Sequence, residues 1–268
     1  QARDFVLRQQ GSSQRSLQAL RQIWAPMRPE RLAPARSSST ANPTIWFDPS
    51  QVAEATTALF TPPSGESTAL ATGSGRGQAH RVVLNHGEGV LRHYRRGGLM
   101  ARLSPDRYLG RSPLSSRAMN EFTLLRRLRA WDLPVPAPVA ARQVRGLIGH
   151  TADIVVAMIP QTRNVAQALS DGPLAAPEWS ALGRAIRRLH DHQVFHSDLN
   201  CHNLLLDTQG RAWIVDFDKC GVRHGDAWKQ DNLERLRRSL RKEQGRRNPF
   251  HWEEASWDAL LKGYAGEA

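Results

Sequence analysis

The sequence predicts an α+β fold of two lobes, a small antiparallel-sheet lobe in the N-terminal half and a mainly helical lobe in the C-terminal half. Two observations predict it. Short apolar runs bounded by glycine and proline are typical of strands and prevail in residues 69–160, whereas apolar residues at helical spacing prevail after residue 176. With 268 residues, 40% of them hydrophobic, the chain can bury a substantial core. We expect a basic leader over residues 1–40, the sheet lobe over 41–160 and the helical lobe over 161–268.

The first 40 residues differ in composition from the rest of the chain. They are rich in arginine and serine and hold seven arginines against two acidic residues. Organellar transit peptides have a similar composition. We favour the simpler interpretation of an upstream extension or a truncated gene start, with one marginal helix near residues 17–24. The leader is therefore expected to be disordered, and the folded domain to begin near Thr44.

The sheet lobe begins with an expected helix over residues 51–60, which a proline pair ends. Two apolar runs follow, near residue 70 and at 82–84, and they predict strands joined by a turn that contains Gly73, Gly75 and Gly77. Glycine lets backbone N–H groups approach a phosphate closely. The turn is thus a candidate phosphate-covering loop, with a flexible hairpin tip as the alternative.

A cation and a carboxylate are expected to meet between the next strand and the next helix. Arg92 follows the apolar pair Val90 and Leu91, and residues 115–131 carry apolar side chains at helical spacing. Glu121 lies off that apolar stripe and is the only acidic residue between Asp106 and Asp132, which makes it the natural partner of Arg92. The alternatives are a basic face on an edge strand and an exposed helix carboxylate that pairs locally.

The remaining elements lead into the helical lobe. A proline-rich stretch ends the helix, and residues 153–160 predict a strand that enters a hinge between the lobes, where free backbone groups would meet a nucleotide base. Apolar periodicity then predicts helices over residues 177–191, 230–242 and 252–264.

One short run holds most of the residues that could carry chemistry. It has the form H-x-D-x-x-x-x-N, from His196 through Asp198 to Asn203, and Asp216 follows a short distance later. In the catalytic loops that share this pattern, the Asp orients or deprotonates an attacking hydroxyl, while the Asn and a later Asp hold magnesium. Ordinary turn and cap residues are the alternative.

The spacing between Asn203 and Asp216 has a mechanical reason. Residues 204–206 and 212–215 are apolar and are separated by a turn that contains Gly210, which predicts a β-hairpin. The open ends of its two strands lie side by side. Asn203 and Asp216 are therefore expected to reach the same metal–triphosphate complex.

Histidine and cysteine give weaker signals. His190, His192, His196 and His202 are close in sequence, but their spacing does not fit a zinc site, and His196 is expected to hold the loop by packing and hydrogen bonding. Cys201 lies inside the run from His196 to Asn203, and Cys220 lies just beyond Asp218. A disulfide could lock the site, but we favour free thiols that act as small packing residues.

The net charge of +12 indicates an anionic partner, such as nucleic acid, an anionic membrane surface or an acidic substrate. No apolar run approaches the length of a membrane span and no secretory signal is evident, so we expect the body of the protein to be cytosolic.

With these motifs in hand, the chain resembles the 3-deoxy-D-manno-octulosonic acid (Kdo) kinases of the lipopolysaccharide kinase family, within the protein-kinase-like superfamily. The resemblance covers about residues 45–265 and is carried by three stretches, Leu91-Arg92-His93-Tyr94-Arg95-Arg96-Gly97-Gly98, His196-Ser197-Asp198-Leu199-Asn200-Cys201-His202-Asn203 and Trp213-Ile214-Val215-Asp216-Phe217-Asp218-Lys219-Cys220-Gly221.

The resemblance implies a bilobal protein-kinase-like fold and an enzyme that moves the γ-phosphoryl of ATP to the 4-hydroxyl of Kdo in a Kdo-lipid A precursor. By position, Asp198 would be the catalytic base, Asn203 and Asp216 the Mg²⁺ ligands, and Arg92 with Glu121 the pair that positions the phosphates of ATP. It further implies a peripheral protein on the cytoplasmic side of the cell inner membrane of a Gram-negative bacterium. That anionic surface would use the basic charge, and no nucleic acid is expected as a partner. The alternatives are a heptose kinase of the same family, a RIO-type protein kinase and a basic pseudokinase adaptor.

Overall fold

The structure is a computed structural model that describes residues 36–37, 42–62, 69–70, 79–94, 116–146 and 149–266. The helix predicted near residues 17–24 and the predicted phosphate-covering turn with Gly73, Gly75 and Gly77 lie outside these residues.

The N-terminal half forms a seven-stranded sheet with the strand order β1-β2-β6-β7-β5-β4-β3. Every neighbouring pair is antiparallel. The strands are β1 (Arg36–Ser37), β2 (Thr44–Phe47), β3 (Ala69–Leu70), β4 (Ala79–Leu84), β5 (Gly87–His93), β6 (Pro138–Arg145) and β7 (His150–Ala157). The pairing of β3 with β4 confirms the strands predicted on either side of the glycine-rich turn. β1 lies within the predicted leader and adds an edge to the sheet, which the sequence did not indicate.

The helix predicted over residues 51–60 is wrong except for its last turn, the 3-10 helix η2 (Thr57–Phe60). Val52, Ala55 and Phe60 are all buried against one face of the sheet. β-branched residues in this segment favour helix only weakly, and contact with the sheet decides its path. Strand β6 was not predicted because alanine and arginine are poor strand formers, although Ala140 and Ala141 are fully buried in it.

Helix α2 (Arg117–Ala130) follows the prediction closely. Its first turn is capped by Ser116, whose Oγ accepts a hydrogen bond from the N–H of Met119 at 3.1 Å. The C-terminal half contains the helices α3 (Val165–Asp171), α4 (Ala176–Asp191), α5 (Ala227–Gln244) and α6 (Glu254–Ala265). Its short strands are β8 (Thr162–Asn164), β9 (Val194–Phe195), β10 (Leu204–Asp207), β11 (Ala212–Ile214) and β12 (Gly221–Val222). The three long helices confirm the predicted ones, whereas α3 and β8 were not predicted.

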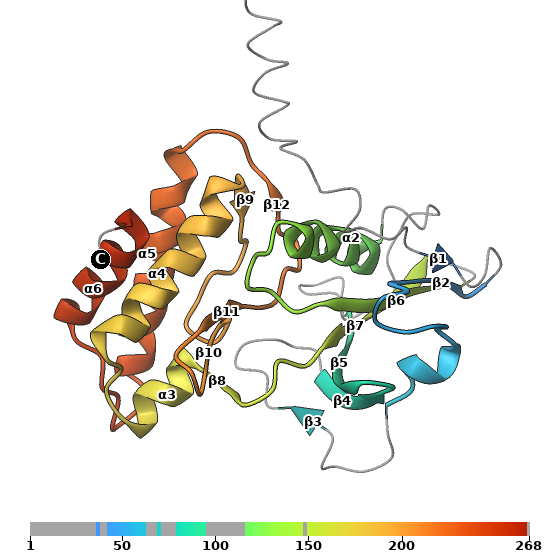
Figure 1. Ribbon diagram of the computed structural model, residues 1–268, viewed down its shortest axis with the longest axis horizontal. Helices are drawn as coiled ribbons and strands as arrows, with labels where there is room; N and C mark the ends of the chain where they lie inside the picture. Colours follow the sequence, from blue (N-terminus) through green and yellow to red (C-terminus); the bar gives the residue numbers. More distant parts are fainter. Residues whose placement is uncertain are drawn as a thin grey trace, which may run out of the picture.

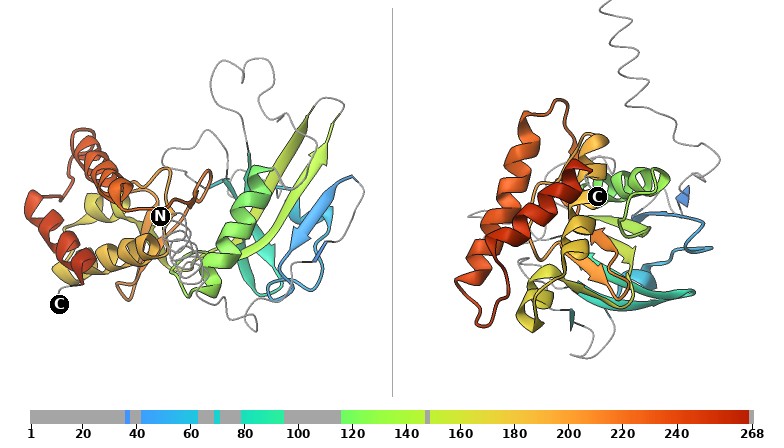
Figure 2. Two further views of the ribbon diagram at one scale, coloured as in Figure 1. Left: turned by 90° about the horizontal axis from the view of Figure 1, so that it is seen from above. Right: turned by 60° about the vertical axis from the view of Figure 1, so that its left-hand side comes forward.

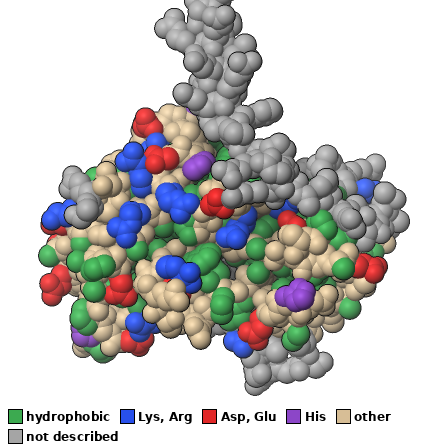
Figure 3. Space-filling model, viewed as in Figure 1, with side chains coloured by type: hydrophobic (Ala, Val, Ile, Leu, Met, Phe, Trp, Pro, Cys, Tyr) green, Lys and Arg blue, Asp and Glu red, His purple; other side chains and the backbone are tan. Residues whose placement is uncertain are grey.

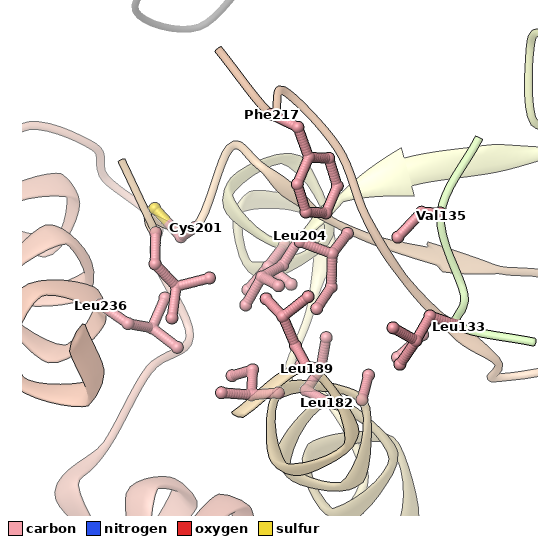
Figure 4. Packing of buried hydrophobic residues seen from close by; sticks show 14 of the residues in the cluster. Leu133, Val135, Leu182, Leu189, Cys201, Leu204, Phe217 and Leu236 are labelled. Carbon is pink, nitrogen blue, oxygen red and sulfur yellow. The ribbon is translucent and has the colours of Figure 1, made fainter. Parts of the chain in front are cut away.

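The sheet with α2 lies on one side of the molecule and α4, α5 and α6 lie on the other (Figures 1 and 2). A large apolar core joins the two sides, because α2, the inner face of the sheet, α4 and the hairpin β10–β11 all contribute to it. Figure 4 shows Leu182 and Leu189 of α4 beneath Leu204 and Phe217 of the hairpin segment. A second, smaller core covers the other face of the sheet. The hairpin is thus fixed where the sheet side and the helical side meet.

No helix in the described part of the chain combines the length and the apolarity that crossing a bilayer requires.

Candidate active site

The predicted hairpin is present. β10 and β11 pair antiparallel with Leu204 opposite Ile214, and one step further the N–H of Val215 donates to the carbonyl of Asn203 at 3.0 Å. This last bond closes the open end of the hairpin between Asn203 and Asp216. The structure therefore brings these two residues together as the spacing predicted.

His196 holds the loop that precedes the hairpin. The ring is fully buried, donates from Nε2 to the carbonyl of Val215 at 3.0 Å and accepts the N–H of Asp198 on Nδ1 at 3.3 Å. Burial lowers its pKa, which favours the neutral ring that this donor and acceptor pattern needs. The predicted structural role of His196 is confirmed.

Asp198 and Asn203 are tied together within the loop. The side-chain amide of Asn203 donates to the backbone carbonyl of Asp198 at 2.9 Å, and so does the amide of Asn200 at 3.0 Å. Both bonds use the backbone carbonyl of Asp198 and not its carboxylate, and the side chain is 39% exposed. The carboxylate is paired with the guanidinium of Arg235 on α5.

Arg92 contacts two carboxylates at once. One N–H group of its guanidinium donates to Glu121 on α2 and another to Asp216, so the predicted pair of Arg92 and Glu121 is present. Glu121 is buried, which overturns the alternative of an exposed helix carboxylate, and its second oxygen accepts the hydroxyl of Tyr94. Burial works against the charged guanidinium, but Glu121 and then Asp216 outweigh it and raise the pKa of Arg92. Burial also raises the pKa of Glu121, which Arg92 opposes.

The segment around Asp216 has an unusual backbone and further anchors. Asp216 has a φ of 66°, in the left-handed region that non-glycine residues adopt rarely and aspartate more often than most. Asp218, which follows Phe217 in the sequence, pairs with Arg117 of α2. The Nε of Arg117 donates to Oδ1 of Asp218 at 2.8 Å. Ser197 Oγ donates to the carbonyl of Asp218 at 2.7 Å. The loop with Asp198 and the segment around Asp216 are therefore fastened to each other and to α2.

Both cysteines are free thiols, as expected. Burial raises the pKa of Cys201 to about 11 and that of Cys220 to about 12, so neither is an activated nucleophile. The histidines near the site bond to protein groups, as expected for residues that do not bind zinc. His190 contacts Tyr264 and Asn232. His192 contacts a backbone carbonyl, and His202 contacts Glu243.

The connection after β7 was predicted to be a hinge with free backbone groups, and the structure differs from this prediction at Met158. The N–H of Met158 donates to the carbonyl of Glu88 at 2.8 Å, so it is not free to meet a nucleotide base. A cavity of about 250 Å³ lies along this connection, between Pro136, Met158 and Trp213. It lies at the turn end of the hairpin, away from Asn203 and Asp216, and so is separate from the catalytic cluster.

Three contacts of the cluster escaped the sequence analysis. They are the pairs of Arg235 with Asp198, of Arg117 with Asp218 and of Tyr94 with Glu121. The tertiary fold brings these residues together, and no spacing in the sequence marks them. The sequence signal that could have indicated one of these contacts is Asp218 itself, an acidic residue directly after Asp216-Phe217 that is available to a cation.

The mixed α+β architecture and the cluster of Asp198, Asn203 and Asp216 are typical of a kinase. The sequence comparison identifies the family: residues 65–264 match the lipopolysaccharide kinase (Kdo/WaaP) family, and the chain belongs to it. A 3-deoxy-D-manno-octulosonic acid kinase of Photobacterium profundum is 40% identical over 226 residues, which span 83% of this chain and 95% of that protein. The enzyme of the same name from Vibrio cholerae serotype O1 has the same identity and coverage. That of Haemophilus influenzae (strain 86-028NP) is 41% identical over 203 residues, 73% of this chain and 84% of that protein.

Proposed function

We propose that this protein is a Kdo kinase, which transfers the γ-phosphoryl group of ATP to the 4-hydroxyl of Kdo in a Kdo-lipid A precursor during assembly of the lipopolysaccharide inner core. Relatives named as Kdo kinases that match most of the chain support it. The observation that carries it is the meeting of Asn203 and Asp216 at the open end of the hairpin, opposite its turn and beside Asp198. This arrangement suits phosphoryl transfer, in which catalysis consists mainly of positioning and electrostatic stabilisation.

The proposal includes a bilobal protein-kinase-like fold, with the lobes over residues 41–160 and 161–268. The antiparallel sheet with α2 corresponds to the smaller lobe, and α3 to α6 with the hairpin correspond to the larger one. The cluster lies where the two sides share the large core. In this arrangement ATP would bind between the lobes, and Gly73, Gly75 and Gly77 would cover its phosphates.

Asp198 acts as the catalytic base in this proposal. Its carboxylate projects from a loop held by Asn200, Asn203 and His196, and it is exposed enough for a sugar hydroxyl to reach it. It orients the acceptor hydroxyl toward the phosphorus atom and accepts its proton as the new bond forms.

Arg92 binds the phosphates of ATP, and Glu121 holds it in place. In the structure the guanidinium also contacts Asp216, so ATP binding would exchange that contact for phosphate oxygens. An arginine offers a planar fork where a lysine would offer a point charge. The buried Glu121, itself bonded to Tyr94, orients that fork.

Mg²⁺ fits the donors at the end of the hairpin. Asn203 and Asp216 offer one amide and one carboxylate oxygen, and this small set of hard donors suits an ion that retains several waters and binds phosphates. The ion would neutralise charge on the phosphates. Asp216 is 35% exposed, so it remains accessible to such a ligand.

Contact with the anionic inner-membrane surface is part of the proposal, because the acceptor is a lipid. Support comes from the net charge of +12. On the face drawn in Figure 3, Lys and Arg side chains are spread over the helical side among acidic ones and do not form one continuous patch. The candidates for the membrane contact are Arg95, Arg96 and Arg102, basic residues that follow Arg92 in the sequence and lie outside the described residues.

Mass spectrometry of the acceptor tests the proposal. Purified protein is incubated with Mg-ATP and either a Kdo-lipid A precursor or a heptose-bearing acceptor whose Kdo 4-hydroxyl is already phosphorylated. We expect one added phosphate on the first acceptor, located on Kdo by fragmentation, and none on the second. Phosphate on heptose alone would favour a heptose kinase. Nucleotide binding without transfer to either acceptor would favour an adaptor and contradict the proposal.

A further inference from the structure

Arg235 lies directly against the candidate base. Its Nη2 donates to Oδ1 of Asp198, and the two side chains are 47% and 39% exposed. An acceptor hydroxyl must reach the same carboxylate to lose its proton. Arg235 must therefore either leave when the acceptor binds or take part in binding it.

The fold determines where Arg235 stands. Three residues before it on α5, Asn232 donates to the carbonyl of His196 at 2.8 Å, and four residues after it, Ser239 Oγ accepts the N–H of Cys201 at 3.0 Å. Residues at this spacing share one face of a helix. Leu236 on the next position packs into the core near Cys201 (Figure 4). The catalytic loop is thus held to α5 on both sides of Arg235, so the contact with Asp198 is built into the packing.

Stability gives little reason for this contact, because an exposed ion pair contributes at most about 1 kcal/mol to folding. Within the described residues, Asp198 is the hydrogen-bond partner of the Arg235 guanidinium. A guanidinium has five N–H donors and matches a carboxylate with two parallel hydrogen bonds. Arg235 can consequently keep its position and bind a second anionic group beside the base.

Kdo has such a group, since it is an octulosonic acid with a carboxylate at C1. Only C2 and C3 separate that carboxylate from the carbon that bears the 4-hydroxyl, so a hydroxyl at Asp198 brings the carboxylate within reach of Arg235. We propose that Arg235 binds the acceptor carboxylate and thereby selects an acidic sugar over a neutral heptose. This inference rests on the proposed function and names a specificity residue of the same site.

Steady-state kinetics of Arg235→Ala and Arg235→Lys test the inference. Losing a charge-assisted hydrogen-bonded contact is expected to raise the acceptor KM about tenfold or more in Arg235→Ala, with the KM for ATP unchanged. Arg235→Lys should recover part of the loss, because lysine keeps the charge but lacks the fork. Arg163→Ala is the matched control, since Arg163 forms a similarly exposed pair with Asp171 near the turn end of the hairpin, and its KM values should equal those of the wild type.

An acceptor whose Kdo carboxylate is converted to a carboxamide tests whether Arg235 recognises that carboxylate or affects the reaction in another way. The wild type should use the amide about tenfold or more less well than the acid, whereas Arg235→Ala should use both equally. If the variant still discriminates as strongly as the wild type, Arg235 does not bind the carboxylate and the inference is overturned. If the wild type transfers phosphate to neither acceptor, the proposed function fails as well. Thermal unfolding of each variant, with and without ATP, verifies that the fold is intact.

Discussion

Arg92 balances the negative charge of two carboxylates in the site, because it contacts the buried Glu121 and the partly exposed Asp216 at once. Removing the guanidinium would leave Glu121 buried without its cation, and breaking a buried pair on one side costs about 3–5 kcal/mol. We expect Arg92→Met to be destabilised by that amount in chemical denaturation. The double variant Arg92→Met/Glu121→Gln should recover much of the loss, since no buried charge then remains unpaired. Equal stability of Arg92→Met and the wild type would show that the pair does not carry this charge balance.

The predicted metal ligands are tested by ATP-induced stabilisation. A ligand that binds only the folded state raises its stability, so the shift in melting temperature reports on binding. We expect Asp216→Ala to lose most of the Mg²⁺-dependent part of this shift and Asn203→Ala a smaller part, because a carboxylate binds a hard cation more strongly than an amide does. The comparison is made with Mg²⁺ and with EDTA. An undiminished Mg²⁺-dependent shift in both variants would remove these residues from the metal site.

Protonation of buried His190 makes stability depend on pH. Burial lowers the pKa of His190 from 6.5 to about 4. Between these values the unfolded chain binds a proton that the folded chain does not, so stability falls as the pH decreases through this window. The full effect of His190 is about 3 kcal/mol. In denaturant titrations at pH 7 and pH 5, His190→Gln should lose less stability on acidification than the wild type does. The same loss in both proteins would contradict the assignment.

The residues of the site could be predicted only in part. The sequence motif and the hairpin of fixed length that follows it predicted Asp198, Asn203 and Asp216. Glu121 could be predicted because no other nearby acidic residue competes for Arg92. Arg235 could not be found, since it is one of many arginines and only the packing of α5 brings it to Asp198.

At the scale of elements, periodic apolar residues predicted α2, α4, α5 and α6 to within a few residues. Strand β6 and helix α3 escaped prediction because contacts with neighbouring elements, and not local preference, determine them. The wrong helix over residues 51–60 has the same cause, since the sheet surface holds that segment in another conformation.

The crossing of α4 and α6 depends on two glycines. A Cβ on Gly183 would lie 2.1 Å from the carbonyl oxygen of Leu260, and one on Gly263 would lie 2.2 Å from that of Ser180. The helices would have to separate, so we expect Gly183→Ala to lose at least about 2–3 kcal/mol of unfolding free energy. Gly172→Ala is the control, because among the described residues, its chain neighbours aside, no atom lies within 4 Å of the added Cβ. Equal stabilities of the two variants would mean that the helices pack less closely than described.

On the scale of the whole molecule, one continuous core joins the sheet to the helices, and the proposed catalytic cluster lies at that junction. Arg92 and Glu121 come from the sheet side, whereas Asp198, Asn203 and Arg235 come from the helical side. Asp216 contacts Arg92 across the junction. We therefore expect that phosphate positioning by Arg92 and acceptor chemistry at Asp198 use residues from different sides and can be separated by mutation.

Phosphotransfer by Asp198→Asn tests the central claim most directly. The substitution keeps the volume of the side chain but removes the carboxylate that would accept the acceptor proton, so we expect transfer to the Kdo-lipid A precursor to fall at least ~10²-fold. ATP-induced stabilisation and thermal unfolding should stay close to those of the wild type. Transfer within about tenfold of the wild-type rate by a folded, ATP-binding variant would contradict the assignment of Asp198 as the base.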